Sequence, residues 1–181
     1  MLIPSPTPLI REEQIAKRVD ELGAEIADAM GRDKPITVLG LLRGCFMFAA
    51  DLTRAIARHG GGIEEIDFII ASSYGSGTES SGNVKIERDA RRDIAGKHVL
   101  VIDDILDTGH TLQRIRGLLL SRDPALLKIA VMLDKPSRRQ VEAHAEFTGF
   151  SIEDHFVVGY GLDFNQRYRE LPYITTVVEE G

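Results

Sequence analysis

The sequence has little of several features that point to particular classes of protein. It contains one cysteine, Cys45, and no tryptophan in 181 residues. A single cysteine excludes an intrachain disulfide and a cysteine cluster, and its apolar neighbours Phe46, Met47 and Phe48 predict a buried thiol. Basic residues are outnumbered, because 22 lysines and arginines face 28 acids and the formal net charge is −6. Without a basic excess or a basic run, nucleic acid is not an expected partner.

Long apolar runs are also missing. No stretch approaches the length that crosses a bilayer, and prolines at positions 4, 6 and 8 interrupt the first residues before an apolar leader can form. We therefore expect a cytoplasmic chain without a membrane partner. The length and the 43% hydrophobic content suit one core, and a second full domain would be cramped. The expectation is a single domain over 1–181.

What the sequence does contain is an alternation of strand and helix patterns. Apolar residues at three- and four-residue spacing predict helices over 12–30, 46–58 and 109–119. Short apolar runs predict strands at 36–42, 66–71, 84–87, 99–102, 127–133 and 156–160. This alternation is typical of an α/β fold, a parallel twisted sheet with helices on both faces. The segment 72–83 is rich in glycine and serine and predicts a long mobile loop.

Polar residues follow four of the predicted strands. They are Arg43-Gly44, Ser73-Tyr74, Asp103 to Thr111, and Asp134-Lys135. In parallel sheets, ligands bind beyond the carboxyl ends of the strands. We expect these four segments to line one crevice.

The third of these segments carries the most information. Asp103 and Asp104 directly follow the buried run at 99–102, and adjacent carboxylates that lose hydration repel each other unless a hydroxyl-rich ligand or a divalent cation offsets the charge. The small polar turn from Asp107 to Thr111 then opens a helix, where free amides and two threonine hydroxyls suit a phosphate. The alternative is that Asp107 and Thr108 merely cap the helix, but capping leaves three acids after a buried strand unexplained.

The segment resembles the phosphoribosyl-pyrophosphate signature of type I phosphoribosyltransferases, in which four apolar residues precede two acids, two apolar residues, an acid and Thr-Gly-x-Thr. Four further segments are similar, in order and spacing, to the bacterial hypoxanthine phosphoribosyltransferases: Leu41 to Gly44, Ser72 to Gly75, Leu133 to Pro136, and Phe156 to Asp163 with Arg169. The resemblance runs from about the first predicted strand to the C-terminus. It implies the type I phosphoribosyltransferase fold, with a small purine-binding hood formed by the N-terminal segment and roughly 150–181.

The resemblance also implies a reaction. A purine salvage enzyme of this family transfers the phosphoribosyl group from phosphoribosyl pyrophosphate (PRPP) to N9 of hypoxanthine, and here also of guanine, giving IMP or GMP and pyrophosphate, with Mg²⁺ as cofactor. The family forms dimers and tetramers, so a homodimer or homotetramer is expected.

For the sugar donor, the resemblance assigns separate residues to the ribose and metal, to the 5′-phosphate and to the pyrophosphate of PRPP. Asp103 and Asp104 would hold the ribose hydroxyls and the metal, and Asp107 would act as general base near purine N7. The 5′-phosphate would lie on Asp107, Thr108, Gly109, His110 and Thr111. Arg43-Gly44, in a loop that holds a cis peptide in the family, and Arg169 would bind pyrophosphate, while Ser73 and Tyr74 would close over the reacting centre and exclude water.

For the purine, the resemblance assigns binding to Lys135, Phe156, Val157 and Asp163. An ammonium at Lys135 can donate to the oxygen at purine position 6, where the amino group of adenine cannot accept, so 6-oxopurines are preferred. Phe156 would stack on the ring, the Val157 backbone would read its edge, and Asp163 would also hold magnesium.

Each purine-side residue has a plainer alternative. For Lys135 the alternative is an ordinary surface lysine, for Phe156 and Val157 it is core packing, and for Asp163 it is a turn residue beside Gly161. Arg169 reads as the partner of Glu170 in a surface ion pair, and the Gly/Ser loop as an idle one.

The sequence departs from the family's pattern at three positions. Many relatives carry Glu at the position of Asp103, and Lys at those of Arg43 and His110. Two rival functions also remain: a regulatory protein that senses PRPP or nucleotides while binding nucleic acid, and a transferase for xanthine and guanine or a non-purine base.

Overall fold

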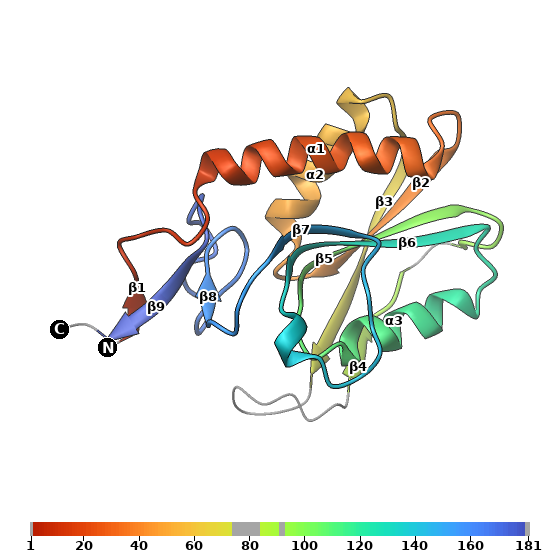
Figure 1. The fold of residues 1–181 in the computed structure, drawn as a ribbon. Helices are drawn as coiled ribbons and strands as arrows, with labels where there is room; N and C mark the ends of the chain where they lie inside the picture. The colour runs from red at the N-terminus through yellow and green to blue at the C-terminus, as the bar shows by residue number, and fades with distance from the viewer. Residues whose placement is uncertain (1, 74–83, 91–92, 180–181) are drawn as a thin grey trace.

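The computed structural model describes residues 2–73, 84–90 and 93–179. Its centre is a six-stranded sheet in the order β4-β3-β2-β5-β6-β7 (Figure 1). The strands are β2 (Pro35–Leu42), β3 (Gly62–Ser73), β4 (Val84–Arg88), β5 (His98–Leu106), β6 (Leu126–Asp134) and β7 (Phe147–Ser151). Neighbours from β3 to β7 run parallel, as predicted. The exception is β4, which is antiparallel to β3.

Helices cover both faces of this sheet, which confirms the predicted α/β class. α1 (Glu12–Met30) and α2 (Phe46–Arg58) lie on one face and α3 (His110–Leu120) on the other (Figure 1). Side chains of a strand alternate between faces, so Leu100 and Ile102 pack in the core under α1 and α2, whereas Val99 and Val101 pack in the core under α3. Burial on both faces explains why this strand reads as a continuous apolar run.

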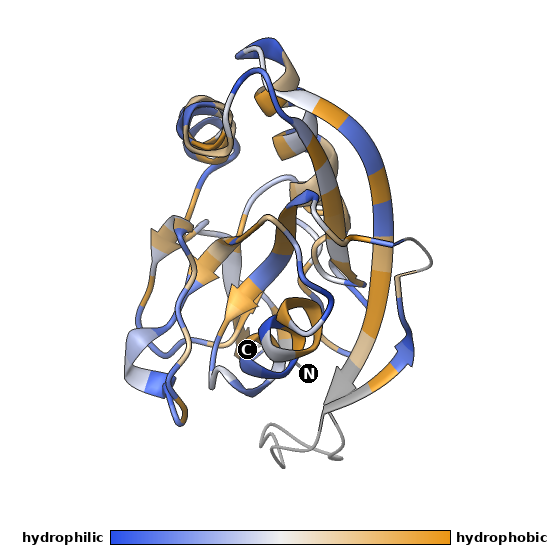
Figure 2. Cartoon of the chain, turned by 90° about the vertical axis from the view of Figure 1, so that its right-hand side faces the viewer, coloured by the Kyte–Doolittle hydropathy of each residue, from blue (hydrophilic) through white to orange (hydrophobic). Residues whose placement is uncertain are grey.

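The strand β3 has a different pattern, because β4 pairs only with its last residues, Ile70 to Ser73. Figure 2 shows alternating hydrophobic and hydrophilic bands along its first half, where Ile63, Glu64, Glu65, Ile66 and Asp67 follow one another. Ile66 is 48% exposed. This half of β3 is therefore only partly covered, as expected near a sheet edge.

The two chain ends pair in a separate three-stranded sheet, in the order β1-β9-β8. β1 (Leu2–Pro4) and β9 (Thr175–Glu179) are antiparallel neighbours, and β8 (Val157–Val158) completes the sheet on the other side of β9. The strand predicted at 156–160 is thus shorter than expected. It ends because Gly159 and Tyr160 have positive φ values of 98° and 49°, which no strand accommodates.

Three strands were not predicted: β1, β7 and β9. A short 3₁₀ helix, η1 (Pro136–Arg138), after β6 was also not predicted. Cys45 is buried, as predicted. Within the described residues, no helix is both long and apolar enough to cross a membrane.

Candidate active site

A cavity of about 510 Å³ opens at the carboxyl ends of β2, β3 and β5. Its lining joins segments that are far apart in the sequence. The predicted site residues that line it are Arg43, Gly44, Asp103, Asp104, Asp107, Thr108, Gly109, Thr111, Asp163 and Arg169. The predicted meeting of strand ends therefore holds for β2 and β5, while His110, Lys135, Phe156 and Val157 lie outside this lining.

The two adjacent acids form the anionic part of the cavity. They belong to β5 itself, which continues past them to Leu106 rather than ending at Ile102. The backbone amide of Asp104 donates to Asp103 Oδ1 at 2.9 Å, and the amide of Ile105 donates to Asp104 Oδ1 at 2.8 Å. Burial raises the pKa of both carboxyl groups; repulsion by Asp104 adds to the effect and lifts the pKa of Asp103 well above its usual range. A bound cation or hydroxyl groups would stabilise the charged forms.

The loop after β2 lies directly against the second acid. A Cβ at Gly44 would come within 1.5 Å of Asp104 Oδ2, and the Gly44 carbonyl oxygen lies 2.0 Å from where a Cβ of Gly161 would be. Only glycine fits at either position. The cis peptide bond of this loop is Leu42–Arg43, the bond before Arg43–Gly44.

The turn between β5 and α3 presents backbone amides to the cavity. Gly109 has a φ of 95° and precedes the helix, whose first bond runs from the Gln113 amide to the Gly109 carbonyl at 2.9 Å. The amides before Gln113 therefore have no acceptor within the helix. No side chain caps α3, so the interpretation of Asp107 and Thr108 as helix caps is wrong. His110 contacts Gln140 with its ring, Nε2 to Oε1 at 3.2 Å.

Arg169 is held in place at the opposite side of the cavity. Its Nη1 donates to the Gly161 carbonyl at 2.7 Å, and its Nη2 lies 2.8 Å from Asp163 Oδ1. The ion-pair partner is therefore Asp163 and not Glu170. The second oxygen of Asp163 accepts from the Gln166 amide at 2.8 Å, so both of its oxygens are engaged.

Gln166 was not among the predicted site residues. Its Oε1 accepts from Arg169 Nη2 at 3.1 Å and from Arg43 Nη1 at 3.3 Å, so one amide oxygen lies between the two guanidinium groups of the cavity. Gln166 has a φ of 66°, a conformation that no sequence pattern indicates for glutamine.

The predicted purine-side residues lie beside the cavity. Lys135 is 7% exposed, with Nζ 3.7 Å from Asp154 Oδ1, so it is not an ordinary surface lysine. Phe156 is 45% exposed and packs edge-on against Phe164 at 5.7 Å between ring centroids, so it is not a core residue. Val157 is buried and belongs to the core.

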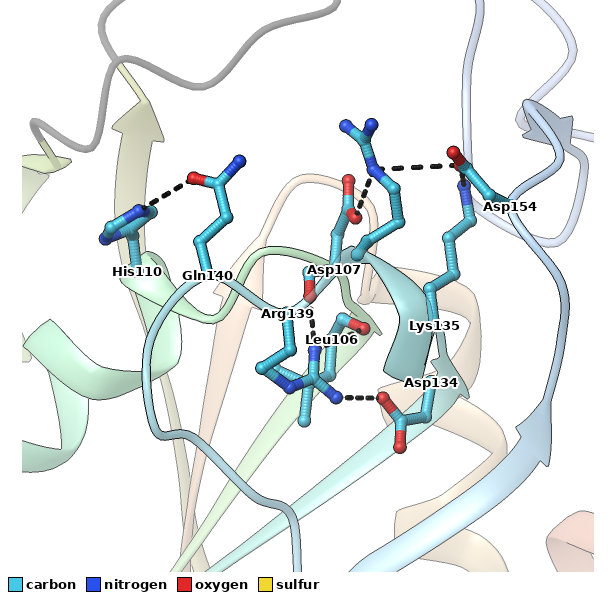
Figure 3. A network of polar contacts seen from close by, with 9 residues as sticks. Leu106, Asp107, His110, Asp134, Lys135, Arg139, Gln140 and Asp154 are labelled. Atoms are coloured by element: carbon cyan, nitrogen blue, oxygen red, sulfur yellow. Dashed lines mark hydrogen bonds and ion pairs between the residues drawn. The ribbon is translucent and has the colours of Figure 1, made fainter.

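Two arginines at the same strand end were missed. Arg138 Nε lies 3.1 Å from Asp107 Oδ1, whereas Arg139 donates to the carbonyls of Leu106 and Asp107 and pairs with Asp134 (Figure 3). Pro136 is a sequence signal for the helical turn itself, but residue types do not indicate that a side chain of this turn reaches Asp107.

Two further expectations concern the loop after β3 and the metal. Ser72 and Ser73, the first two residues of the predicted mobile loop, instead belong to β3, where Ser73 pairs with Val84 of β4. Tyr74 and the rest of the predicted loop lie outside the described residues. Among 2–73, 84–90 and 93–179, no three histidine, cysteine or acidic side chains are grouped so that they alone could hold a metal. A cation at Asp103 and Asp104 would need further ligands from substrate or water.

The comparisons with known proteins identify the family of the chain. Residues 9–165 match the model of the phosphoribosyl transferase domain. The hypoxanthine phosphoribosyltransferase of Escherichia coli K12 is 49% identical over 173 residues, covering 94% of each chain, and the hypoxanthine-guanine phosphoribosyltransferase of Aquifex aeolicus is 47% identical over 169 residues, covering 93% of each.

Solved structures indicate the same family. A hypoxanthine-guanine phosphoribosyltransferase from Bacillus anthracis superposes with a TM-score of 0.87 at 40% identity, covering 98% of this chain and 100% of that one. The Trypanosoma cruzi hypoxanthine phosphoribosyl transferase, studied for the role of its C-terminal region in oligomeric state and enzymatic activity, superposes with a TM-score of 0.88 at 38% identity, covering 97% of this chain and 92% of that one. The chain therefore belongs to the phosphoribosyltransferase family and groups within it with the hypoxanthine phosphoribosyltransferases.

Proposed function

We propose that this protein is a purine salvage enzyme that transfers the phosphoribosyl group from PRPP to N9 of hypoxanthine, and also of guanine, releasing pyrophosphate. The observation that carries the proposal is the cavity in which Asp103 and Asp104, the turn from Asp107 to Thr111, and the guanidinium groups of Arg43 and Arg169 come together. Anionic, amide-rich and cationic parts of one cavity match the ribose, the 5′-phosphate and the pyrophosphate of a single donor molecule.

The charges of the cavity residues suit the reaction at the sugar donor, PRPP. Displacement of pyrophosphate from the anomeric carbon builds positive charge on the ribose and negative charge on the leaving group. Fixed carboxylates at Asp103 and Asp104 stabilise the first, and Arg43 and Arg169 stabilise the second. The free amides before Gln113 and the hydroxyls of the turn hold the 5′-phosphate and so fix the position of the sugar.

Magnesium fits the acid pair. Mg²⁺ is commonly bound by one or two carboxylates together with substrate phosphates and water, and two buried carboxyl groups with raised pKa values are a donor set that a cation stabilises. When bound, the ion neutralises charge on the pyrophosphate as it leaves. Asp163 is the third proposed ligand of the Mg²⁺ ion. To coordinate the ion, Asp163 would have to release its contact with Arg169 or its contact with Gln166.

The acceptor half uses residues beside the cavity. Asp107 takes the proton from purine N7 as general base, and Lys135 donates to the oxygen at purine position 6. The exposed ring of Phe156 offers a stacking surface, and the Val157 backbone lies next to it to read the purine edge. Ser73 and Tyr74 belong to the segment that closes over the reacting centre.

The proposal extends to domain organisation and assembly. We place the purine under a hood made from the chain ends, because β8 follows Phe156 directly and pairs with β9. The whole of 1–181 then acts as one phosphoribosyltransferase domain, and we propose a homodimer or homotetramer as its assembly.

The test is pyrophosphate release from PRPP and Mg²⁺ with hypoxanthine, guanine, xanthine and adenine offered separately. We expect turnover with hypoxanthine and guanine and little with adenine, whose amino group cannot accept from Lys135. Turnover limited to xanthine and guanine would move the assignment to the rival transferase. PRPP binding without turnover on any purine would support the regulatory alternative instead.

A further inference from the structure

The strand end that carries Lys135 also carries a side chain with no assigned role. Resting on the proposed function, we propose that Arg138 is a positioning residue for the transfer: it orients the Asp107 carboxylate and, through Asp154, links it to Lys135. The group that takes the purine proton and the group that reads the purine oxygen would thereby be held at a fixed separation.

The geometry comes from the short helix η1. The Arg138 amide donates to the Lys135 carbonyl at 3.1 Å, so one helical turn separates the two residues and places both side chains on the same side. Arg138 Nε lies 3.1 Å from Asp107 Oδ1 and 3.7 Å from Asp154 Oδ1, and Lys135 Nζ lies 3.7 Å from the same Asp154 oxygen. Figure 3 shows the resulting row of alternating charges from Asp107 to Lys135.

The contact with Asp107 leaves room for a substrate. Within the described part of the chain, only Oδ1 of Asp107 has a side-chain partner, and Oδ2 is not engaged. A carboxylate fixed through one oxygen presents the other in a defined direction, which is what proton transfer to a positioned base requires. Lys135 is 7% exposed and cannot move freely, so the row begins from a fixed point directly after β6.

The neighbouring Arg139 holds the backbone of the turn, so an effect of Arg138 on side-chain orientation can be told apart from an effect on folding. Arg139 binds the main-chain carbonyls of Leu106 and Asp107 and pairs with Asp134, so it fixes the backbone of the turn. The Arg138 side chain, in contrast, contacts the carboxylates of Asp107 and Asp154. Because Asp154 is 53% exposed, its ion pair with Arg138 adds little to stability. Loss of the Arg138 side chain should therefore leave the backbone contacts of Arg139 with the turn in place and release Oδ1 of Asp107.

The experiment is a double-mutant cycle in steady-state kinetics with PRPP and hypoxanthine. We expect Arg138→Ala to lower kcat by about tenfold or more, the effect of one charge-assisted hydrogen bond, with KM for PRPP nearly unchanged. Arg138→Lys should recover part of the loss. In an Asp107→Asn background, Arg138→Ala should have little further effect, because the carboxylate that it orients is already gone.

The matched control is Arg116→Ala, which removes a partly buried arginine that pairs with Glu146 and does not line the cavity; its kcat should equal that of the wild type. Equal kcat in Arg138→Ala and wild type would overturn the inference, and so would a full tenfold loss in the Asp107→Asn background. Absence of turnover in the wild type would instead overturn the proposed function, so the two failures are distinguishable.

Discussion

Asp103 is a carboxyl group that the fold places out of contact with water, 7% exposed and next to a second acid. Its folded-state pKa is well above the unfolded value of about 3.9. As the pH rises from that value, the unfolded chain loses this proton before the folded chain does. The folded state binds more protons in this range, so stability falls with rising pH. The site therefore lowers the stability of the free protein at neutral pH.

Asp103→Asn should accordingly raise the melting temperature at pH 7, because the amide keeps the shape and the acceptor oxygen without the charge. The gain should shrink as the pH is lowered towards 4, where the folded carboxyl group is protonated and about half of the unfolded carboxyl groups are protonated as well. Thermal unfolding of both proteins from pH 4 to 8 measures this. A difference that is constant across that range would show that the charge is not the cause.

Asp107→Asn tests the proposed general base. The amide can still accept from Arg138 but cannot take a proton, so we expect kcat to fall by about 10²-fold or more while KM for PRPP changes little. Steady-state kinetics measures both constants. Asp33→Asn, at the opposite end of the sheet and exposed, is the control and should behave as wild type. Unchanged turnover in Asp107→Asn would remove the general-base role.

Residues at this scale were predictable to different degrees. Asp103, Asp104 and the turn that follows stand in one short segment, so their proximity follows from sequence order alone. The contact of Arg169 with Asp163 and the contact of Arg138 with Asp107 depend on how a turn or a short helix directs long side chains. Such directions are set by backbone conformations, such as the positive φ of Gln166, that residue type does not indicate.

At the scale of elements, the central strands were predictable because burial on both faces leaves a continuous apolar signature. β1, β7 and β9 are short, and β1 pairs with β9 at the other end of the chain. A strand of three residues carries too little pattern to stand out, and only its partner stabilises it. The same difference applies to the site. Its residues on the central sheet could be predicted from the sequence pattern, whereas those near the C-terminus were identified only through the resemblance.

The contact between the β2 loop and β5 gives a prediction with a built-in control. Gly44→Ala places a Cβ 1.5 Å from Asp104 Oδ2, so the loop or the acid must move, and both stability and PRPP affinity should fall. Gly117→Ala, in α3, meets nothing within 4 Å and should raise the free energy of unfolding by about 0.5–1 kcal/mol, because alanine favours a helix. Denaturant unfolding and PRPP titration measure the two effects. Equal behaviour of the two variants would contradict the close approach at Gly44.

At the scale of the whole molecule, the structure has a large sheet that carries the acid pair and the turn, and a small sheet that joins the chain ends. The small sheet depends on residues from both termini. Thr175, which is fully buried, donates from Oγ1 to the carbonyls of Ser5 and Thr7 at 3.1 and 3.0 Å. If this sheet shapes the purine-binding side, a defect in it should weaken purine binding and leave PRPP binding unchanged.

Thr175→Val removes the hydroxyl and leaves two carbonyls without that donor, at a cost of about 1–3 kcal/mol. Deletion of residues 2–7 goes further and removes β1 as well. We expect KM for hypoxanthine to rise in the order wild type, Thr175→Val, deletion, while PRPP affinity changes little, because no residue of either change lines the cavity of Asp103 and Asp104. Kinetics with each substrate varied in turn measures this order. A parallel loss for both substrates would mean that the chain ends support the whole fold rather than the purine side.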